Sequence, residues 1–208
     1  MRGYTVCVGI FCLCIAGCIT VVADHFTIDD PNLESAPLKL DGYYYHLVPH
    51  FSADPSLGKA IDPILLWRDG TAAYVGRSGR RLNDSEIGPT RYGTLENAHG
   101  DFQRFINDPQ LFDRTINGGI RWGKFRVGED SLLLQVFRLS FGTIPRSYDV
   151  SEYKGRILSD TSFVLDEVRL YGPPHRGASG AMSDTFYFRH VEEKPSSMNW
   201  TQTHPDLQ

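Results

Sequence analysis

The sequence predicts a mainly β protein: an antiparallel eight-stranded up-and-down barrel with one inserted helix near 94–107. Three observations support this fold class. From residue 38 onward, short aromatic or β-branched runs alternate with turn residues, which is typical of strands. The 20 glycines and 12 prolines supply many turns. Neighbouring runs pair in order along the chain, and closing such a sheet removes both of its edges, so a barrel is favoured over a sandwich.

Eight runs are candidate strands, and three short turns join six of them as hairpins. Asp69-Gly70 is the strongest turn signal, because a type I′ turn needs positive φ at both central residues. The other two turns lie at 128–130 and 159–160. We expect 170–183, which is rich in Gly and Pro, to be a loop. The candidate strands cover residues 40–48, 64–68, 71–75, 122–127, 131–138, 153–158, 161–168 and 184–191.

One helix is predicted between the third and fourth strands. Within 94–107 the apolar residues recur at spacings of three and four, which places them on one helical face. Thr94 is suited to begin the helix, and Asp108-Pro109 is suited to end it. Gly100 lowers the helix propensity by about 1 kcal/mol relative to Ala. The apolar face consists of Leu95, Ala98, Phe102, Phe105 and Ile106.

The N-terminus has the pattern of a secretory signal. Arg2 precedes an uncharged, apolar run over residues 4–23. All four cysteines lie within the first 18 residues, so the domain that follows has no disulfide framework and no cysteine zinc site. Two further interpretations stay open. The run is long enough to span a bilayer as an uncleaved anchor, or it is a plain signal that is cut after Ala16 or Ala23.

Residues Ile15-Ala16-Gly17-Cys18 resemble the lipobox of bacterial lipoproteins. In that family a diacylglyceryl group is attached to the Cys thiol, and the signal is cut before the Cys. The resemblance implies a signal peptide over 1–17, a lipidated Cys18 and a tether over 18–37. Because Ile19 follows the Cys instead of Asp, the resemblance also implies sorting to the outer membrane of the cell envelope.

Four short motifs, which together span roughly 40–168, carry a second resemblance. Residues 42–44 (GYY) open the first strand where lipocalins carry Gly-x-Trp. Residues 67–71 (WRDGT), 122–125 (WGKF) with 129–131, and 155–158 with 161–163 resemble successive hairpins of uncharacterised envelope proteins. The domain over 38–191 therefore resembles the lipocalin-like (calycin-type) domains of bacterial envelope lipoproteins. This resemblance implies a β-barrel and a small hydrophobic ligand, and it carries over no catalytic residue.

Aromatic residues on the predicted strands supply the candidate ligand site. Alternate side chains of a strand share a face, so Tyr44 lies with His46, and Phe186 lies with Phe188. Tryptophans at strand ends suit a barrel mouth, because an indole has an apolar body and a polar tip. The competing interpretation is that these rings simply fill a small barrel. The candidate ligand-binding residues are Tyr44, His46, Trp67, Trp122, Phe186 and Phe188.

The sequence predicts no catalytic residue, no metal site and no cofactor. A net charge of −4 argues against nucleic acid as a partner, because phosphates require a basic face. The seven histidines form no H-E-x-x-H motif. Residues 76–80 and 177–181 come close to G-x-S-x-G, but each lacks the final glycine.

Three function hypotheses follow. The first is a membrane-anchored envelope lipoprotein whose barrel binds a small apolar ligand or another envelope component. The second is a structural or assembly protein with a side-chain-filled barrel and a protein partner. The third, with the least support, is a hydrolase that acts on envelope glycan or lipid. In each case residues 192–208 are predicted to be a polar tail outside the fold.

Overall fold

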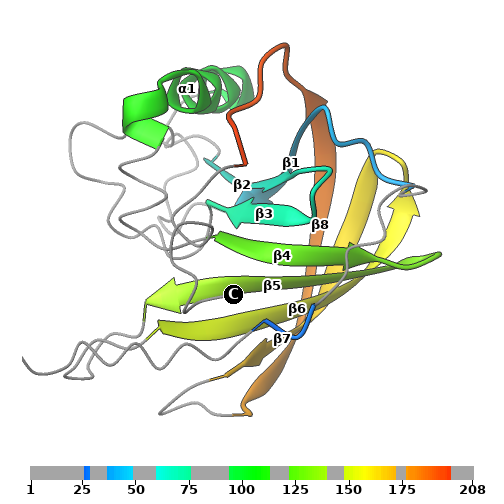
Figure 1. Ribbon diagram of the computed structural model, residues 1–208. Coiled ribbons are helices and arrows are strands. Elements are labelled where there is room, and N and C mark those ends of the chain that lie inside the picture. Colours follow the sequence, from blue (N-terminus) through cyan, green and yellow to red (C-terminus); the bar gives the residue numbers. More distant parts are fainter. Residues whose placement is uncertain are drawn as a thin grey trace, which may run out of the picture.

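The computed structural model describes residues 26–28, 37–48, 60–75, 94–112, 122–139, 148–171 and 177–197. Eight strands form one closed antiparallel barrel in chain order, and β8 closes the barrel by pairing with β1 (Figure 1). The predicted up-and-down barrel is thus confirmed. The strands are β1 (Gly42–Val48), β2 (Ala60–Leu66), β3 (Thr71–Tyr74), β4 (Trp122–Val127), β5 (Ser131–Leu139), β6 (Tyr148–Ser159), β7 (Ser162–Leu170) and β8 (Ser179–His190).

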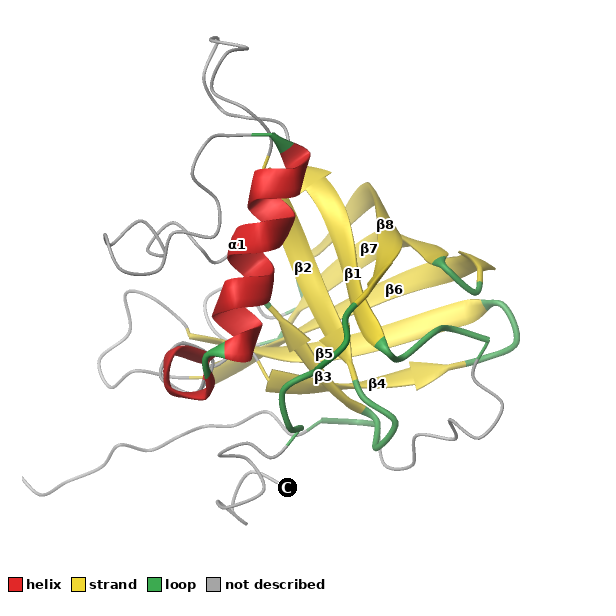
Figure 2. Ribbon diagram, turned by 90° about the horizontal axis from the view of Figure 1, so that it is seen from above, coloured by secondary structure: helices red, strands yellow, loops and turns green. Residues whose placement is uncertain are grey.

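The predicted helix is present as α1 (Leu95–Asn107), which lies across the outside of the barrel near β1 and β2 (Figure 2). Its first turn is capped by Thr94, whose side-chain oxygen accepts a hydrogen bond from the Asn97 N–H at 3.3 Å. The face that packs on the barrel is the predicted one: Ala98, Phe102, Phe105 and Ile106 are buried, and Leu95 is partly buried.

Three strands begin earlier than the sequence indicates. β2 begins at 60 and not 64, β6 begins at 148 and not 153, and β8 begins at 179, inside the predicted loop. Pro63 is tolerated in β2 because it lies where the β2–β3 ladder ends. Its carbonyl accepts the Val75 N–H at 2.9 Å. The hydrogen bond that Pro63 cannot donate belongs to this same pair, so the missing bond falls at the end of the ladder and not within it. In β8, pairing with β7 outweighs the low strand propensity of a Gly- and Ser-containing segment.

The β2–β3 hairpin is confirmed, but its turn differs from the predicted two-residue form. The Gly70 N–H donates to the Trp67 carbonyl at 3.1 Å, and Gly70 has φ 81°. This is the three-residue arrangement in which a turn is followed by a glycine in the left-handed region. The Asp69 carboxylate supports it by accepting the Thr71 N–H at 2.9 Å. The Asp-Gly pair therefore predicts the position of the hairpin correctly. Gly70, however, takes the left-handed position that follows the turn and is not one of its two central residues.

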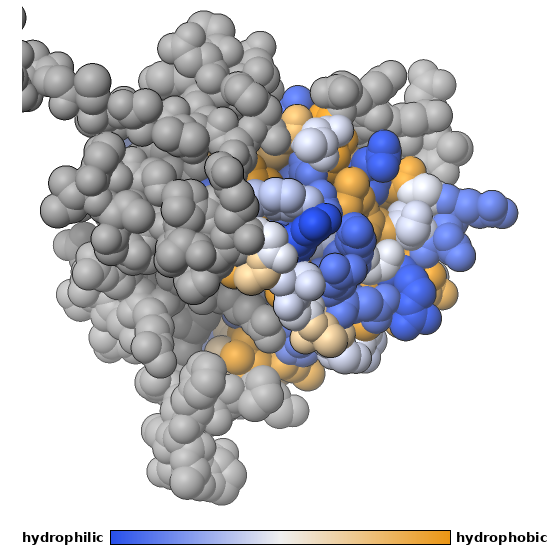
Figure 3. All heavy atoms as spheres, turned by 90° about the horizontal axis from the view of Figure 1, so that it is seen from below, coloured by the Kyte–Doolittle hydropathy of each residue, from blue (hydrophilic) through white to orange (hydrophobic). Residues whose placement is uncertain are grey.

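Besides a small cluster around Phe137 and Val150, the described residues form two large apolar cores, because side chains from both faces of several strands are buried. One fills the barrel and the other lies between α1 and β1–β3. On the described surface seen from below, hydrophilic and hydrophobic residues are intermixed (Figure 3). The interior core includes Tyr44, Ile64, Phe125, Leu134, Phe163 and Phe186. The outer core includes Tyr43, Leu65, Phe102, Phe105, Phe112 and Trp122.

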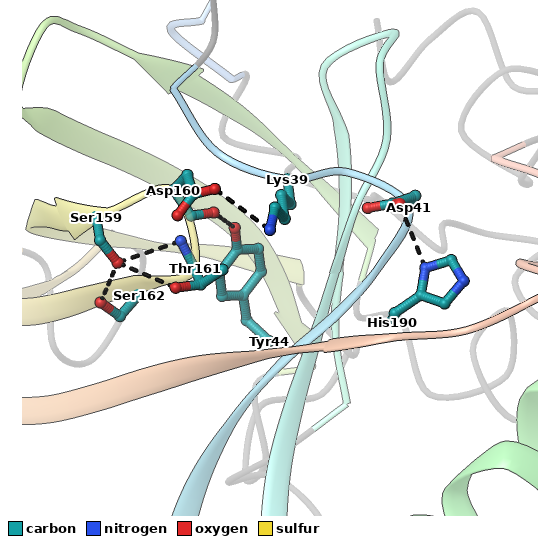
Figure 4. A network of polar contacts seen from close by, with 8 residues as sticks. All are labelled: Lys39, Asp41, Tyr44, Ser159, Asp160, Thr161, Ser162 and His190. Carbon is teal, nitrogen blue, oxygen red and sulfur yellow. Dashed lines mark hydrogen bonds and ion pairs between the residues drawn. The ribbon is translucent and has the colours of Figure 1, made fainter.

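The hairpin end of the barrel, where the β2–β3, β4–β5 and β6–β7 turns lie, is covered by residues 37–41. The Lys39 N–H donates to the Asp160 carbonyl at 3.0 Å. The Tyr44 hydroxyl donates to the same oxygen at 2.9 Å (Figure 4). The Lys39 Nζ also lies 3.3 Å from the Asp160 carboxylate. Leu38 packs into the interior core. These contacts hold the segment before β1 against the β6–β7 turn.

Part of the predicted polar tail also packs against this end. The Lys194 Nζ donates to the carbonyl oxygens of Leu40 and Leu66. Burial of this amine lowers its pKa to about 7, because the ammonium form loses its hydration. The expectation of an unpacked tail is therefore wrong for residues 192–197, whereas 198–208 lie outside the described residues.

The predicted signal peptide over 1–17 and the predicted lipidation site Cys18 lie outside the described residues. None of the helices in the described ranges has the length and apolar character needed to cross a membrane. Within the predicted tether, residues 26–28 lie on the outer wall of the barrel, drawn in blue in Figure 1. The Phe26 and Phe137 rings are 4.4 Å apart there.

Candidate functional site

Four of the six candidate residues face the barrel interior. Tyr44 and His46 project inward from β1, and Phe186 and Phe188 project inward from β8, the strand that pairs with β1. The ring centroids of Tyr44 and Phe188 are 5.4 Å apart, and those of His46 and Phe186 are 5.6 Å apart. The structure therefore brings these four side chains together along one seam of the barrel.

Trp67 and Trp122 lie on the other side of the barrel wall, in the outer core. Their ring centroids are 5.2 Å apart, and their exposed fractions are 8% and 1%. The Trp67 Nε1–H donates to the Pro195 carbonyl at 2.8 Å. Strand alternation explains the placement, because Trp67 follows the inward-facing Leu66 and so points outward. The expectation that both tryptophans join the same site as the four inward residues does not fit this arrangement.

The interior is filled by aromatic rings toward the hairpin end. Phe163 and Phe186 are stacked at 5.1 Å, and Tyr44 lies 4.9 Å from Phe163. None of the three residues is more than 1% exposed. Desolvation raises the pKa of Tyr44 far above its usual range, so its hydroxyl keeps the proton that it donates to Asp160. We call these three residues the aromatic floor, and for them the filling interpretation holds.

Polar groups face the interior toward the distal end, where β1 ends and β8 begins. The His46 Nδ1 lies 3.0 Å from the Thr185 carbonyl oxygen. Because a carbonyl only accepts, Nδ1 carries a proton. The other ring nitrogen, Nε2, lies 3.7 Å from the Asp184 carboxylate. The side chains of His46 and Asp184 are 20% and 12% exposed, so both are only partly buried.

Further side chains connect this polar pair to the aromatic floor. Tyr74 packs edge-on against Tyr153 at 5.4 Å and against Phe186 at 6.1 Å. Tyr153 and Met182 are only partly buried against the interior core. Asp62 is the register partner of His46, so it shares the inward face. The distal interior therefore offers carboxylate, imidazole and phenol groups beside apolar surface.

Sequence reasoning did not select Asp62, Tyr74, Tyr153 or Asp184. Asp62 falls outside the predicted second strand, because an Asp-Pro pair is typical of turns. Asp184 was identifiable, since it stands two residues before Phe186 on a predicted strand and so shares its face. Tyr74 and Tyr153 lie on predicted strands whose inward face the sequence leaves undetermined.

The arrangement has the chemistry of a small-molecule binding site. In the part of the chain that the structure describes, no group of three or more His, Cys, Asp or Glu side chains could hold a metal ion. Of the two near-matches to G-x-S-x-G, residues 76–80 lie outside the described residues. Ser179 of the other is exposed at the start of β8. The distal interior provides hydrogen-bonding groups beside apolar side chains that are only partly buried.

Comparison with known proteins identifies no relative: no family model matches the chain, and neither a curated protein nor a solved structure matches it.

Proposed function

We propose that this protein is a lipid-anchored component of the bacterial cell envelope whose barrel binds a small molecule through its distal end. The observation that carries the binding proposal is the His46–Asp184 pair, which faces the interior of a closed barrel and is still reached by solvent. An eight-stranded barrel is just wide enough to hold one small ligand. The aromatic floor limits how deep such a ligand enters.

The chemistry of the lining indicates a ligand with an apolar body and a hydrogen-bonding group. Tyr153 and Met182 offer apolar surface that the protein itself covers only in part. The Asp184 carboxylate accepts hydrogen bonds, and the His46 ring presents Nε2 toward the same space. A purely apolar ligand would displace the water that reaches these side chains and offer no hydrogen bond in return, which costs free energy.

Native mass spectrometry tests the binding proposal. The domain from residue 24 onward is purified from the periplasm, and its native mass is compared with its denatured mass. A small molecule that is lost on denaturation is the expected result. The recovered compound is then titrated onto His46→Leu, for which we expect about tenfold weaker binding from a lost hydrogen bond. Tyr187→Ser is the matched control, because Tyr187 is 49% exposed on the outer face. A bare domain that also takes up nothing from an envelope lipid extract contradicts the proposal.

The anchoring half of the proposal rests on Ile15-Ala16-Gly17-Cys18. In Cys18→Ala the thiol that would be acylated is missing. We therefore expect this variant to retain its signal, migrate as a larger protein and lose the mature membrane-bound form. A variant that matures to the wild-type size and sediments with outer membranes like the wild type contradicts a lipid anchor at Cys18.

An assembly role is the second candidate, and two observations favour it. The aromatic floor leaves part of the barrel with no room for a ligand, and two large apolar side chains are exposed on the outside, Leu158 at 55% and Tyr187 at 49%. A protein partner that is captured by the wild type and lost from the Leu158→Ser/Tyr187→Ser double variant would support this role. A partner that is retained equally by both proteins would exclude this surface.

A further inference from the structure

Residues 26–28 are fixed to the outer wall of the barrel by a buried polar network. The side-chain amide of Gln135 donates to the Thr27 hydroxyl and to the Glu152 carboxylate, both at 2.7 Å. Its oxygen accepts the Thr27 N–H at 2.8 Å. The Tyr171 hydroxyl donates to the other Glu152 oxygen at 3.3 Å. Gln135 and Glu152 point away from the interior, yet they are only 1% and 7% exposed.

This attachment shortens the connection to the predicted anchor. Cys18 and Phe26 are eight positions apart, so the chain between them spans at most about 29 Å. A flexible chain of that length has a root-mean-square reach of only about 16 Å. If the chain were fixed only from Pro37 onward, 19 positions would separate it from Cys18. A lipid at Cys18 therefore holds the wall that carries Phe26 close to the bilayer.

The same wall presents cations. Arg126 of β4 and Lys154 of β6 flank Leu133 of β5 in register, and both are exposed. Neither forms an ion pair with another described residue, although Glu167 is the register partner of Lys154. Lys124 of the same wall lies 5.9 Å from the Phe26 ring centroid.

We propose that the outer wall formed by β4, β5 and β6 lies against the anionic surface of the bilayer to which the chain is anchored. This inference rests on the lipid anchor of the proposed function. Each exposed cation that faces an anionic bilayer raises the ratio of bound to unbound orientations by about fivefold. Arg126 and Lys154 together therefore raise this ratio by about 30-fold. The chain as a whole has a net charge of −4, so its other faces are on balance repelled by such a surface.

Chemical tethering tests the orientation directly. Residues 18–208 contain a single cysteine, Cys18, which can be coupled to a maleimide lipid in vesicles of phosphatidylethanolamine and phosphatidylglycerol. Lysines are then acetylated briefly and the modified sites are quantified by mass spectrometry. We expect Lys154 to react several-fold more slowly on vesicles than in the free protein. Lys39, which is 48% exposed at the hairpin end, should react equally in both.

Two variants and one control separate the effect of charge from the effect of tether length. Arg126→Glu should remove most of the Lys154 protection, whereas Arg68→Glu, the same charge change in the exposed β2–β3 turn, should not. Gln135→Ala should also weaken the protection, because releasing residues 26–28 lengthens the tether. Equal Lys154 rates on vesicles and in solution overturn the proposal. Protection that persists in Arg126→Glu and on pure phosphatidylcholine overturns it too. Because the attachment is chemical, neither result depends on whether cells acylate Cys18, which Cys18→Ala tests separately.

Discussion

The barrel interior and the outer core share the same strands but differ in where their polar groups lie. From β1, Tyr44 and His46 point inward, while Tyr43 and Tyr45 point outward beneath α1. Among the polar groups of the interior, His46 and Asp184 lie toward the distal end and are 20% and 12% exposed. In the outer core, His99 of α1 is 0% exposed. His46 and Asp184 are thus more accessible than His99, which the outer core encloses.

The surroundings of His99 keep its ring neutral. Its Nδ1 lies 2.6 Å from the Tyr43 hydroxyl, and its Nε2 has no hydrogen-bond partner among the described residues. Burial lowers the pKa of His99 to about 4, and the nearby Arg189 charge contributes in the same direction. Burial also raises the pKa of Tyr43, so the phenol keeps its proton and donates it to Nδ1. The outer core therefore contains one buried imidazole that folding tolerates only without charge.

The largest loss of stability is expected when a buried aromatic ring is removed from either core. Phe163 of the interior and Phe102 of the outer core are both 0% exposed. We expect Phe163→Ala and Phe102→Ala each to lower the free energy of unfolding by about 3–5 kcal/mol, measured by urea denaturation. Only Phe163→Ala should also change ligand binding, because its ring belongs to the aromatic floor. Equal binding changes in both variants would contradict the separation of the two cores.

Acid should act mainly on the outer core. The folded-state pKa of His99, about 4, lies below its ordinary value of 6.5, so the unfolded chain binds a proton more readily between these values. The contribution of His99 to stability is therefore complete above pH 6.5 and falls by about 3 kcal/mol as the pH is lowered to 4. Urea denaturation of His99→Gln should show a flatter pH dependence than the wild type. His190→Gln, which removes an exposed histidine that pairs with Asp41 outside the outer core, is measured beside it.

Tyr43 and Tyr44 lie on opposite faces of β1, so removing one hydroxyl from each compares the outer core with the interior core. Tyr43→Phe leaves the buried His99 Nδ1 without its partner, so we expect a loss of about 1–3 kcal/mol in the free energy of unfolding. Tyr44→Phe should cost less, about 1 kcal/mol, because the Asp160 carbonyl keeps the Lys39 N–H as a donor. Thermal and urea denaturation measure both. A larger loss for Tyr44→Phe would reverse the order that we infer.

The smallest effect is expected at the rim of the outer core. Arg189 of β8 and Glu96 of α1 form two hydrogen bonds at 2.8 and 3.3 Å, yet the Glu96 side chain is 71% exposed. This pair lowers the pKa of Glu96 and looks well formed, but solvent screens it. Glu96→Gln should leave the urea midpoint almost unchanged. A shift as large as that of Tyr43→Phe would show that the ion pair, and not the apolar face, holds α1 in place.

Local signals in the sequence predict much of the fold but little of the site. Asp69-Gly70, the Thr94 cap and the apolar face of α1 act within a few residues, so they are visible in the chain. The first residues of β2, β6 and β8 form strands only because a partner strand binds them. The inward face is harder to predict. β1 is aromatic on both faces and both are covered, so the alternation that normally marks the solvent side is lost.

The placement of the tryptophans determines what optical measurements report. Trp67 and Trp122 lie 5.2 Å apart in the outer core, close enough for their indole transitions to couple and give a circular dichroism signal in the ultraviolet. Trp200 lies outside the described residues. Loss of this coupled signal on heating marks separation of the indoles and so reports on the outer core. The described rings of the interior are phenylalanines, His46 and tyrosines such as Tyr74 and Tyr153, so the indole signal does not report on its occupancy.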